Sequence, residues 1–298
     1  MKTFFKHIAV LVLAFLALAN VVSMVSLWSL RNGSFYKPSF LANQVPETQF
    51  DYIVLGASTG LTTLNTTMID SIANIKGINL AMDDTGLGAQ YLMLQHFLAE
   101  GKQTTYCVLA PGVLSYDNME EAVSDNDYRF LMYINRPYVN NHFSEIKKRD
   151  QRVKMLQATK WFPMSGVSYF NAELFWPSLV SILKPNRHNR FDAFGNYTYP
   201  KKNRKFSDSE KKERTIRFVN PYLKKIKSLC KANNIQLIYY LSPLRNTAVR
   251  FSEKEVPVID HTGLIQDDTF FYDDIHVNTP GREITSRAFA EAFKKVEK

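Results

Sequence analysis

The chain has 298 residues, of which 45% are hydrophobic and 13% aromatic, and it carries a formal net charge of +9. This composition is sufficient for a packed core and excludes a globally disordered chain. The basic charge favours an anionic partner. The sequence contains no zinc finger, RNA-binding signature or basic helix motif, so we do not expect nucleic acid to be that partner.

The N-terminal segment, residues 1–32, is predicted to be a membrane anchor. Its residues 8–30 form an apolar run broken only by Asn20 and three serines, and about 20 apolar residues suffice for a helix to cross a bilayer. Lys2 and Lys6 precede the run, which by the positive-inside rule leaves the N-terminus cytoplasmic and the rest of the chain outside. The alternative is a cleaved signal peptide, because Ala17-Leu18-Ala19 fits a small-x-small cleavage site. We favour the uncleaved anchor because the apolar run continues past this site; both interpretations export the protein.

The remainder alternates between strand and helix patterns. We expect residues 33–50 to be a linker and residues 51–298 to form an α/β domain. Apolar, β-branched runs bounded by Gly or Pro predict five strands, whereas apolar residues at helical spacing predict the helices between them. This alternation predicts a central, mostly parallel sheet with right-handed crossovers. The expected strands cover residues 51–56, 78–81, 104–110, 235–241 and 256–260, and the expected helices cover 62–75, 89–99, 208–233 (bent at Pro221) and 279–296.

Residues 116–205 interrupt the alternation. They contain acidic, aromatic and basic patches in turn, with helical patterns and several prolines. We interpret them as a helical and irregular insertion that covers the carboxyl edge of the sheet, where α/β enzymes place substrate-binding loops. The alternative is a satellite hydrophobic core under long loops.

A serine follows the first expected strand. In the segment from Asp51 to Gly60, the apolar run ends at Gly56, and Ser58 stands at the start of the next helix. Ligands of parallel sheets bind at this carboxyl edge. The Ser58 hydroxyl is therefore either a helix cap or a nucleophile.

A carboxylate and an imidazole lie three residues apart near the C-terminus. Asp273 and His276 precede the last expected helix. A carboxylate that orients a histidine makes the imidazole an effective base, and a serine needs such a base to attack a carbonyl at neutral pH. The pair therefore favours Ser58 as the nucleophile, His276 as the general base and Asp273 as the orienting group, with Asp274 as the rival carboxylate. The alternative is a capping histidine in a solvated acidic turn.

These two motifs together resemble the SGNH/GDSL hydrolase superfamily. The sequence Gly56-Ala57-Ser58 and the Asp273-x-x-His276 pair are similar to the first and last motifs of that family, over residues 50–115 and 206–298. The resemblance is closest to its membrane-anchored branch, which includes teichoic-acid D-alanyl transfer proteins and polysaccharide O-acylation proteins. With the strand–helix alternation, it leads us to expect a three-layer sandwich around the sheet.

The resemblance also implies an oxyanion hole. One donor would be the backbone N–H of Ser58, and a second would be a glycine after the second strand, Gly86, with Gly88 in reserve. Either glycine is alternatively a simple turn residue. The family's third donor is an asparagine after the third strand, and this chain departs from that pattern, because it has Ala110-Pro111-Gly112 there. The departure fits the anchored transferase branch better than an ordinary esterase.

The other candidate residues are interpreted as structural. Cys107 and Cys230 lie outside any CxxC pair and are expected to be small buried residues, so no metal site is predicted and no cofactor is implied. The histidines other than the base are expected to be structural or on the surface, with His96 exposed on its helix.

We therefore expect an exported, membrane-anchored serine acyltransferase or esterase acting on O-acyl groups of a cell-envelope polysaccharide. Its partners would be the membrane, the polysaccharide or another acyl acceptor, and a membrane-embedded acyl-donor protein. The alternative is a non-catalytic glycan-binding or assembly protein that keeps the fold. A lipase ranks third, because the chain lacks a separate amphipathic lid pattern.

Overall fold

A computed structural model describes residues 1–119, 122–146, 151–201, 206 and 210–296. The chain forms two compact units, which we treat separately. The sheet unit comprises Glu47–Asn126 and Arg190–Lys298, and the helical unit comprises Met1–Pro46 and Asp127–Asn189. The sheet unit contains β1 (Gln49–Gly56), α3 (Ser58–Thr63), α4 (Thr66–Ala73), β2 (Gly77–Asn79), α5 (Leu87–Ala99), β3 (Gln103–Ala110), η1 (Val113–Asp117), β4 (Lys212–Ile216), α10 (Pro221–Ala232), β5 (Gln236–Leu241), β6 (Thr247–Phe251), β7 (Val258–Asp260), η3 (Asp268–Phe270) and α11 (Thr279–Val296).

The sheet unit is built on five parallel strands in the order β2-β1-β3-β5-β7. The predicted α/β class and parallel five-stranded sheet are confirmed. In the register of the central pair, Gly56 at the end of β1 lies beside Ala110 at the end of β3. The carboxyl ends of these two strands therefore meet at one edge, where the loops that follow them lie together.

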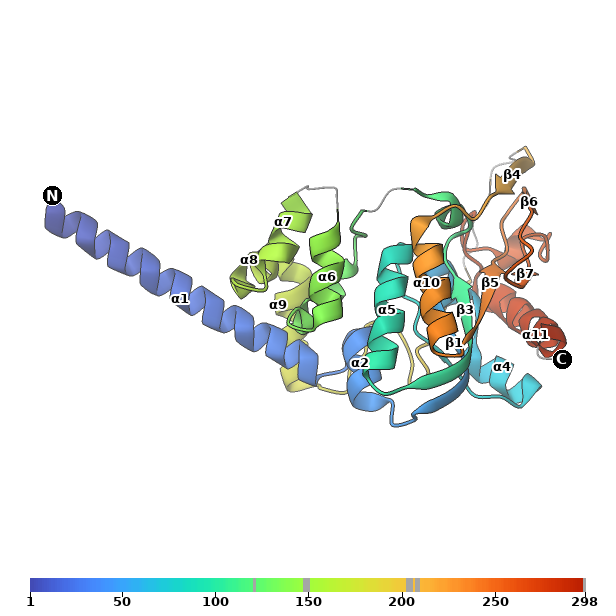
Figure 1. The fold of residues 1–298 in the computed structure, drawn as a ribbon, viewed down its shortest axis with the longest axis horizontal. Helices are drawn as coiled ribbons and strands as arrows, with labels where there is room; N and C mark the ends of the chain where they lie inside the picture. Colours follow the sequence, from blue (N-terminus) through green and yellow to red (C-terminus); the bar gives the residue numbers. More distant parts are fainter. Residues whose placement is uncertain (120–121, 147–150, 202–205, 207–209, 297–298) are drawn as a thin grey trace. The chain divides into compact units, whose positions relative to one another are not determined.

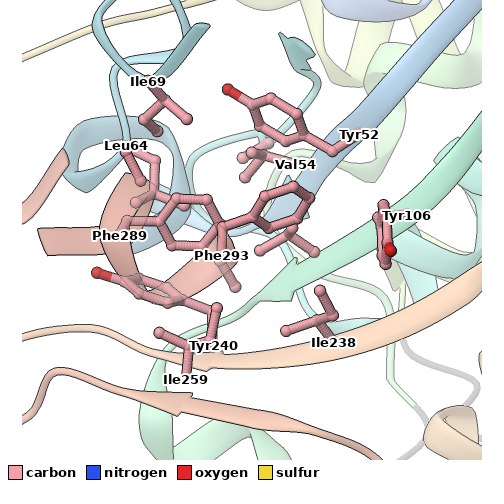
Figure 2. Packing of buried hydrophobic residues seen from close by; sticks show 14 of the residues in the cluster. Tyr52, Val54, Leu64, Ile69, Tyr106, Ile238, Tyr240, Ile259, Phe289 and Phe293 are labelled. Carbon is pink, nitrogen blue, oxygen red and sulfur yellow. The ribbon is translucent and has the colours of Figure 1, made fainter. Parts of the chain in front are cut away.

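One face of the sheet carries an aromatic core. Alternate residues of a strand point to the same face, so Tyr52 and Val54 of β1 join Tyr106 and Val108 of β3 there (Figure 2). Phe289 and Phe293 of α11 pack onto these side chains, and both are fully buried. Full burial of an aromatic side chain of this size contributes about 2–3 kcal/mol, so α11 is held firmly against the sheet.

The other strand residues face the opposite side. Cys107 lies between Tyr106 and Val108, and its thiol is within hydrogen-bonding reach of Cys230 on α10. Both cysteines are buried and reduced. Burial and the neighbouring thiol raise the pKa of Cys107 well above its usual value, as expected for structural rather than reactive thiols. Figure 1 shows α5 and α10 on one side of the strands and α4 and α11 on the other.

The expected helix over residues 208–233 is wrong in its first half. Residues 207–209 lie outside the described part of the chain, residues 212–216 form β4, and the helix begins only at Pro221. Proline is suited to the first turn of a helix because its missing N–H has no intrahelical acceptor there. Asn220 caps the helix, since its side-chain oxygen accepts a hydrogen bond from the N–H of Tyr222 at 2.9 Å. Pro221 therefore starts the helix and does not bend it.

Strand β6 was not predicted. It pairs in parallel with β4 in a separate two-stranded sheet. Its side chains are only partly buried, so the sequence lacks the apolar pattern that marks the central strands.

The helical unit contains α1 (Lys2–Asn32), α2 (Lys37–Gln44), η2 (Asp127–Tyr133), α6 (Pro137–Glu145), α7 (Gln151–Ala158), α8 (Pro163–Tyr169) and α9 (Asn171–Leu183). Helix α1 is long and apolar enough to cross a membrane, judged by its length and composition. Most of the expected insertion, residues 127–189, belongs to this unit together with residues 1–46, and α2 occupies part of the segment expected to be a linker. Figure 1 shows α8 and α9 beside the C-terminal half of α1.

Candidate active site

Ser58 lies where β1 ends and α3 begins. A Cβ atom on Gly56 would lie 2.2 Å from the carbonyl oxygen of Ala110, and one on Gly60 would lie 2.7 Å from the same oxygen. Both glycines are therefore needed for the turn to rest on the end of β3. The N-cap of α3 is Ala57, and Ser58 is the first helical residue. The alternative in which Ser58 is the helix cap is thus wrong, and its hydroxyl is available for another partner.

Asp273 and His276 are presented by a tight turn. The N–H of Tyr272 donates to the carbonyl of His276 at 2.8 Å, and Phe271 forms an antiparallel bridge with Val277. The buried side chain of Asn278 holds the base of this turn, because its Nδ2 donates to the carbonyl oxygen of Thr269 at 2.8 Å. The turn directs the carboxylate and the imidazole to the same side.

The three residues meet in the sheet unit. His276 Nε2 lies 2.8 Å from the Oγ of Ser58, although the two residues are 218 positions apart. On the other side of the ring, His276 Nδ1 lies 2.8 and 2.9 Å from the two carboxylate oxygens of Asp273. An ionised carboxylate only accepts hydrogen bonds, so Nδ1 carries the proton in the neutral ring. Nε2 is then left with a lone pair directed at the serine hydroxyl, which is the geometry a general base needs.

Asp273 is electrostatically suited to remain ionised. Burial by itself raises the pKa of its carboxyl group, but donors outweigh this effect and lower the pKa below its usual value. These donors are the His276 ring and the backbone N–H groups of Ile275 and His276, at 3.0 and 2.9 Å. Hydrogen bonds to the charged form of an acid favour that form.

Asp274, the rival carboxylate, points elsewhere. Its Oδ1 lies 3.3 Å from the Nη1 of Arg245, whose Nη2 also contacts Asp268 at 2.8 Å. The backbone N–H of Arg245 donates to the carbonyl of Asp274 at 3.0 Å. Arg245 therefore ties the loop after β5 to the Asp273–His276 turn, a positioning role that the sequence reasoning missed. A lone arginine in a polar loop has no pattern that would have revealed it.

The two expected oxyanion donors, the backbone N–H groups of Ser58 and Gly86, differ in whether they already donate a hydrogen bond. The N–H of Ser58 is in the first turn of α3, where backbone donors have no intrahelical acceptor. The N–H of Gly86, in contrast, donates to the Oγ of Ser124 at 2.7 Å. Our expectation for Gly86 therefore needs correction: its N–H is engaged, and it becomes a free donor only when the Ser124 hydroxyl moves. Gly88, the reserve, is the second residue of α5, so its N–H also lies in a first helical turn, and the residue is buried.

An aromatic pair covers the histidine. The ring of Tyr199 lies 5.3 Å from that of His276, centroid to centroid, and stacks on Tyr272 at 4.2 Å. Burial raises the pKa of Tyr199 to about 12, so its hydroxyl stays neutral near physiological pH. Tyr199 comes from the end of the expected insertion. The aromatic-rich sequence there was a signal for contact with the site, although not for contact with His276.

A cavity of about 400 Å³ lies in the sheet unit and is lined by chain neighbours of the three residues, although Ser58, Asp273 and His276 themselves do not line it. Its lining includes Thr59 and Ile275, the chain neighbours of Ser58 and His276. Leu114 and Leu244 contribute apolar wall, and basic side chains stand at Lys212, Arg214 and Arg245. This volume is within the usual range of small-molecule sites.

The remaining candidates are structural. His96 is buried on α5, with Nε2 3.8 Å from a carboxylate oxygen of Glu100, so the expectation that it is exposed is wrong. Within the part of the chain that the structure describes, no three His, Cys, Asp or Glu side chains gather closely enough to hold a metal ion.

No protein-family model matches the chain, and comparison with curated proteins finds no significant match.

Proposed function

We propose that the protein is a serine acyltransferase or esterase of the SGNH/GDSL type, with a three-layer α/β sandwich as its catalytic domain. The observation that carries this proposal is the continuous hydrogen-bonded series from Asp273 through His276 to Ser58. Its members come from the two ends of the α/β pattern, as the resemblance implies. The helices on both sides of the parallel sheet support the proposed architecture.

The geometry supports a two-step acyl transfer. In the first step, Ser58 Oγ attacks the acyl carbonyl carbon while His276 Nε2 takes the hydroxyl proton. The tetrahedral oxyanion would be bound by the N–H of Ser58. The bond to the leaving alcohol then breaks, His276 returns the proton to that alcohol, and the acyl group remains as an ester on Ser58.

In the second step, an acceptor hydroxyl loses its proton to His276 Nε2 and attacks the ester carbon; the bond between that carbon and Ser58 Oγ then breaks, and Ser58 recovers the proton from His276. A sugar hydroxyl as the acceptor gives transfer, and water gives hydrolysis. Asp273 keeps Nδ1 protonated in both steps and stabilises the imidazolium form of His276.

The cavity supports a substrate that is both apolar and anionic. Its volume is enough for a short acyl group and part of an alcohol. The apolar side chains of Leu114 and Ile275 suit the acyl part, whereas Lys212 and Arg214 suit a negatively charged acceptor. We infer an O-acylated or O-acylatable cell-envelope polysaccharide as the substrate, with a membrane-embedded protein as the acyl donor.

The proposed location is outside the cytoplasm. Helix α1 would anchor the chain in the membrane, with Lys2 and Lys6 on the cytoplasmic side. A single-pass anchor would hold the catalytic domain near the envelope polymer.

A fluorophosphonate probe tests the proposal. The purified full-length protein is expected to be labelled at one serine, and Ser58→Ala is expected to abolish labelling. Ser115→Ala is the matched control, because Ser115 lines the cavity but is not part of the hydrogen-bonded series, and this variant should be labelled like the parent. Labelling that survives Ser58→Ala would refute the proposal. Incubation of the labelling-competent protein with an acetyl ester, with and without a sugar alcohol, then separates transfer from hydrolysis.

One observation favours a second candidate, a non-catalytic glycan-binding or assembly protein. The N–H of Gly86 is engaged by Ser124, and the chain has no asparagine in the third donor position after β3. A weak oxyanion hole would make acyl transfer slow. This candidate predicts no labelling by the probe, together with retention on immobilised polysaccharide that Ser58→Ala leaves unchanged.

A further inference from the structure

Helices α1 and α9 of the helical unit bury faces on which serines stand beside a few apolar residues. The buried face of α1 includes Ser23, Ser26 and Ser29, and that of α9 includes Ser178 and Ser181. Their contact is close, because Ser29 Oγ donates to the carbonyl oxygen of Ser178 at 2.8 Å. A helix at a protein–water surface does the reverse, burying large apolar side chains and exposing small polar ones. Small residues at the contact are typical of helices that pack within a membrane.

Many large apolar side chains of the same region, including every tryptophan, are exposed. The protein has three tryptophans, and all are exposed, Trp28 at 63%, Trp161 at 74% and Trp176 at 64%. We call these tryptophans, with their exposed apolar neighbours on α8, α9 and the residues before α8, the outer apolar surface. The neighbours are Phe162, Tyr169, Ile182 and Leu183. Tryptophan and tyrosine are enriched where a membrane protein meets the bilayer interface.

The hydrogen bonds that α8 and α9 make with α1 show at which position along the axis of α1 each of them packs. The N–H of Met164, three residues after Trp161 in the chain, donates to Asn20 Oδ1 at 3.3 Å. Trp176 is two residues from Ser178, which contacts Ser29. Asn20 and Ser29 are nine residues apart, or about 14 Å along a helix. Trp161 therefore lies nearer the N-terminus of α1 than Trp176 does, by most of the thickness of one hydrocarbon leaflet.

The level of Trp161 falls within the apolar run of α1. Counted from Ile8, about 20 residues are needed to cross the hydrocarbon core, so Asn20 lies inside that stretch. The ammonium group of Lys160 lies 5.3 Å from the Trp161 ring and donates to the side-chain oxygen of Asn140 at 3.1 Å, so its charge is partnered within the helical unit. The outer apolar surface therefore continues the exposed apolar surface of α1. Lipid that surrounds α1 would cover both surfaces.

We propose that α8 and α9 form a second membrane-contacting element beside α1, and that the outer apolar surface is covered by the acyl chains and headgroups of the bilayer. Trp161 and Phe162 enter the lipid most deeply, and Trp176 lies closer to the headgroups. This element would hold the helical unit against the membrane in addition to the anchor helix. The proposal does not depend on the chemistry of Ser58.

Tryptophan fluorescence of the full-length protein in vesicles tests this proposal. Three single-tryptophan variants are made by changing the other two tryptophans to phenylalanine. Each is reconstituted in phosphatidylcholine–phosphatidylglycerol vesicles with or without lipids brominated on the acyl chains. We expect brominated lipid to reduce Trp161 emission at least twofold, to reduce Trp176 emission less, and aqueous acrylamide to quench Trp161 weakly.

Trp28 is the internal control, because it reports on α1 and not on α8 or α9. The proposal would be overturned if brominated lipid quenches Trp28 while aqueous acrylamide quenches Trp161 fully. That result would still support α1 as a membrane anchor. That outcome would assign the outer apolar surface to water or to a protein partner. Circular dichroism of each variant confirms that the helices are intact before the comparison.

Discussion

Replacing Asp273 by asparagine tests the orientation of the histidine. An asparagine with its oxygen in the Oδ1 position keeps the hydrogen bonds from the backbone N–H groups of Ile275 and His276. Its NH₂ group then occupies the Oδ2 position, 2.8 Å from His276 Nδ1. Because that group only donates, it competes with the remaining Oδ1 acceptor at 2.9 Å and favours the tautomer in which Nδ1 accepts and the ring proton is on Nε2. The nitrogen facing Ser58 then has no lone pair for the serine proton.

The expected size of this effect is large, although the fold should be unchanged. The opposite amide orientation would restore the tautomer but would lose two backbone hydrogen bonds, each contributing about 1 kcal/mol. In Ser-His-Asp triads the equivalent change slows catalysis by roughly 10⁴-fold, or about 5 kcal/mol at 1.36 kcal/mol per tenfold. We therefore expect Asp273→Asn to slow fluorophosphonate labelling of Ser58 by about 10²- to 10⁴-fold, with the thermal unfolding temperature unchanged.

The assay is the second-order rate constant of labelling, followed by in-gel fluorescence over time. Asp274→Asn is the matched control, since the Asp274 side chain is 68% exposed and Arg245 keeps its 2.8 Å ion pair with Asp268. The labelling rate of this variant should stay within about threefold of the parent. Two results would refute the reasoning. One is labelling of Asp273→Asn at the parental rate, and the other is an equal loss in both variants.

Two predictions concern stability. Gly56→Ala should lower the free energy of unfolding by more than about 3 kcal/mol, because its Cβ would lie 2.2 Å from a backbone oxygen. Gly86→Ala should lower it by less than about 1 kcal/mol, because its Cβ would approach only a hydroxyl, at 3.4 Å. Denaturant unfolding compares the two, and equal losses would contradict the steric argument. Burial lowers the pKa of His261 to about 4. Between pH 6.5 and 4 the unfolded chain therefore binds a proton that the folded chain does not, so stability should fall as pH is lowered through this window, by at most about 3 kcal/mol. His261→Gln should remove that part of the pH dependence, and an unchanged pH profile would show that His261 is not its source.

Much of the fold was predictable because the central strands are apolar on both faces. Runs such as that ending at Gly56 are buried on either side of the sheet, and this requirement leaves a pattern that can be read locally. The terminal helix was also predicted with its observed bounds, because its apolar residues recur at helical spacing. The helix expected over residues 208–233 was partly wrong, because β4 is mostly exposed and carries no such pattern.

The candidate site was predictable only in part. Ser58, His276 and Asp273 stand next to recognisable strand and helix boundaries, so their motifs are visible in the sequence. Whether the N–H of Gly86 is free to bind an oxyanion could not be predicted from a local motif. Its hydrogen-bond acceptor is Ser124, 38 residues away along the chain. Arg245 and Tyr199 act through contacts that no local spacing encodes, since each lies in an irregular loop.

The amino-acid sequence by itself determined an apolar N-terminal helix, a parallel α/β sheet and two short motifs at opposite ends of the domain. These features follow from hydrophobic periodicity and from residues with special backbone preferences, which act locally. Only the tertiary structure decided which carboxylate holds His276 and that the serines of α1 and α9 face each other while the tryptophans face outward. Side-chain partners depend on distances between segments that are far apart in the chain, and those distances are set by the packing of the whole unit.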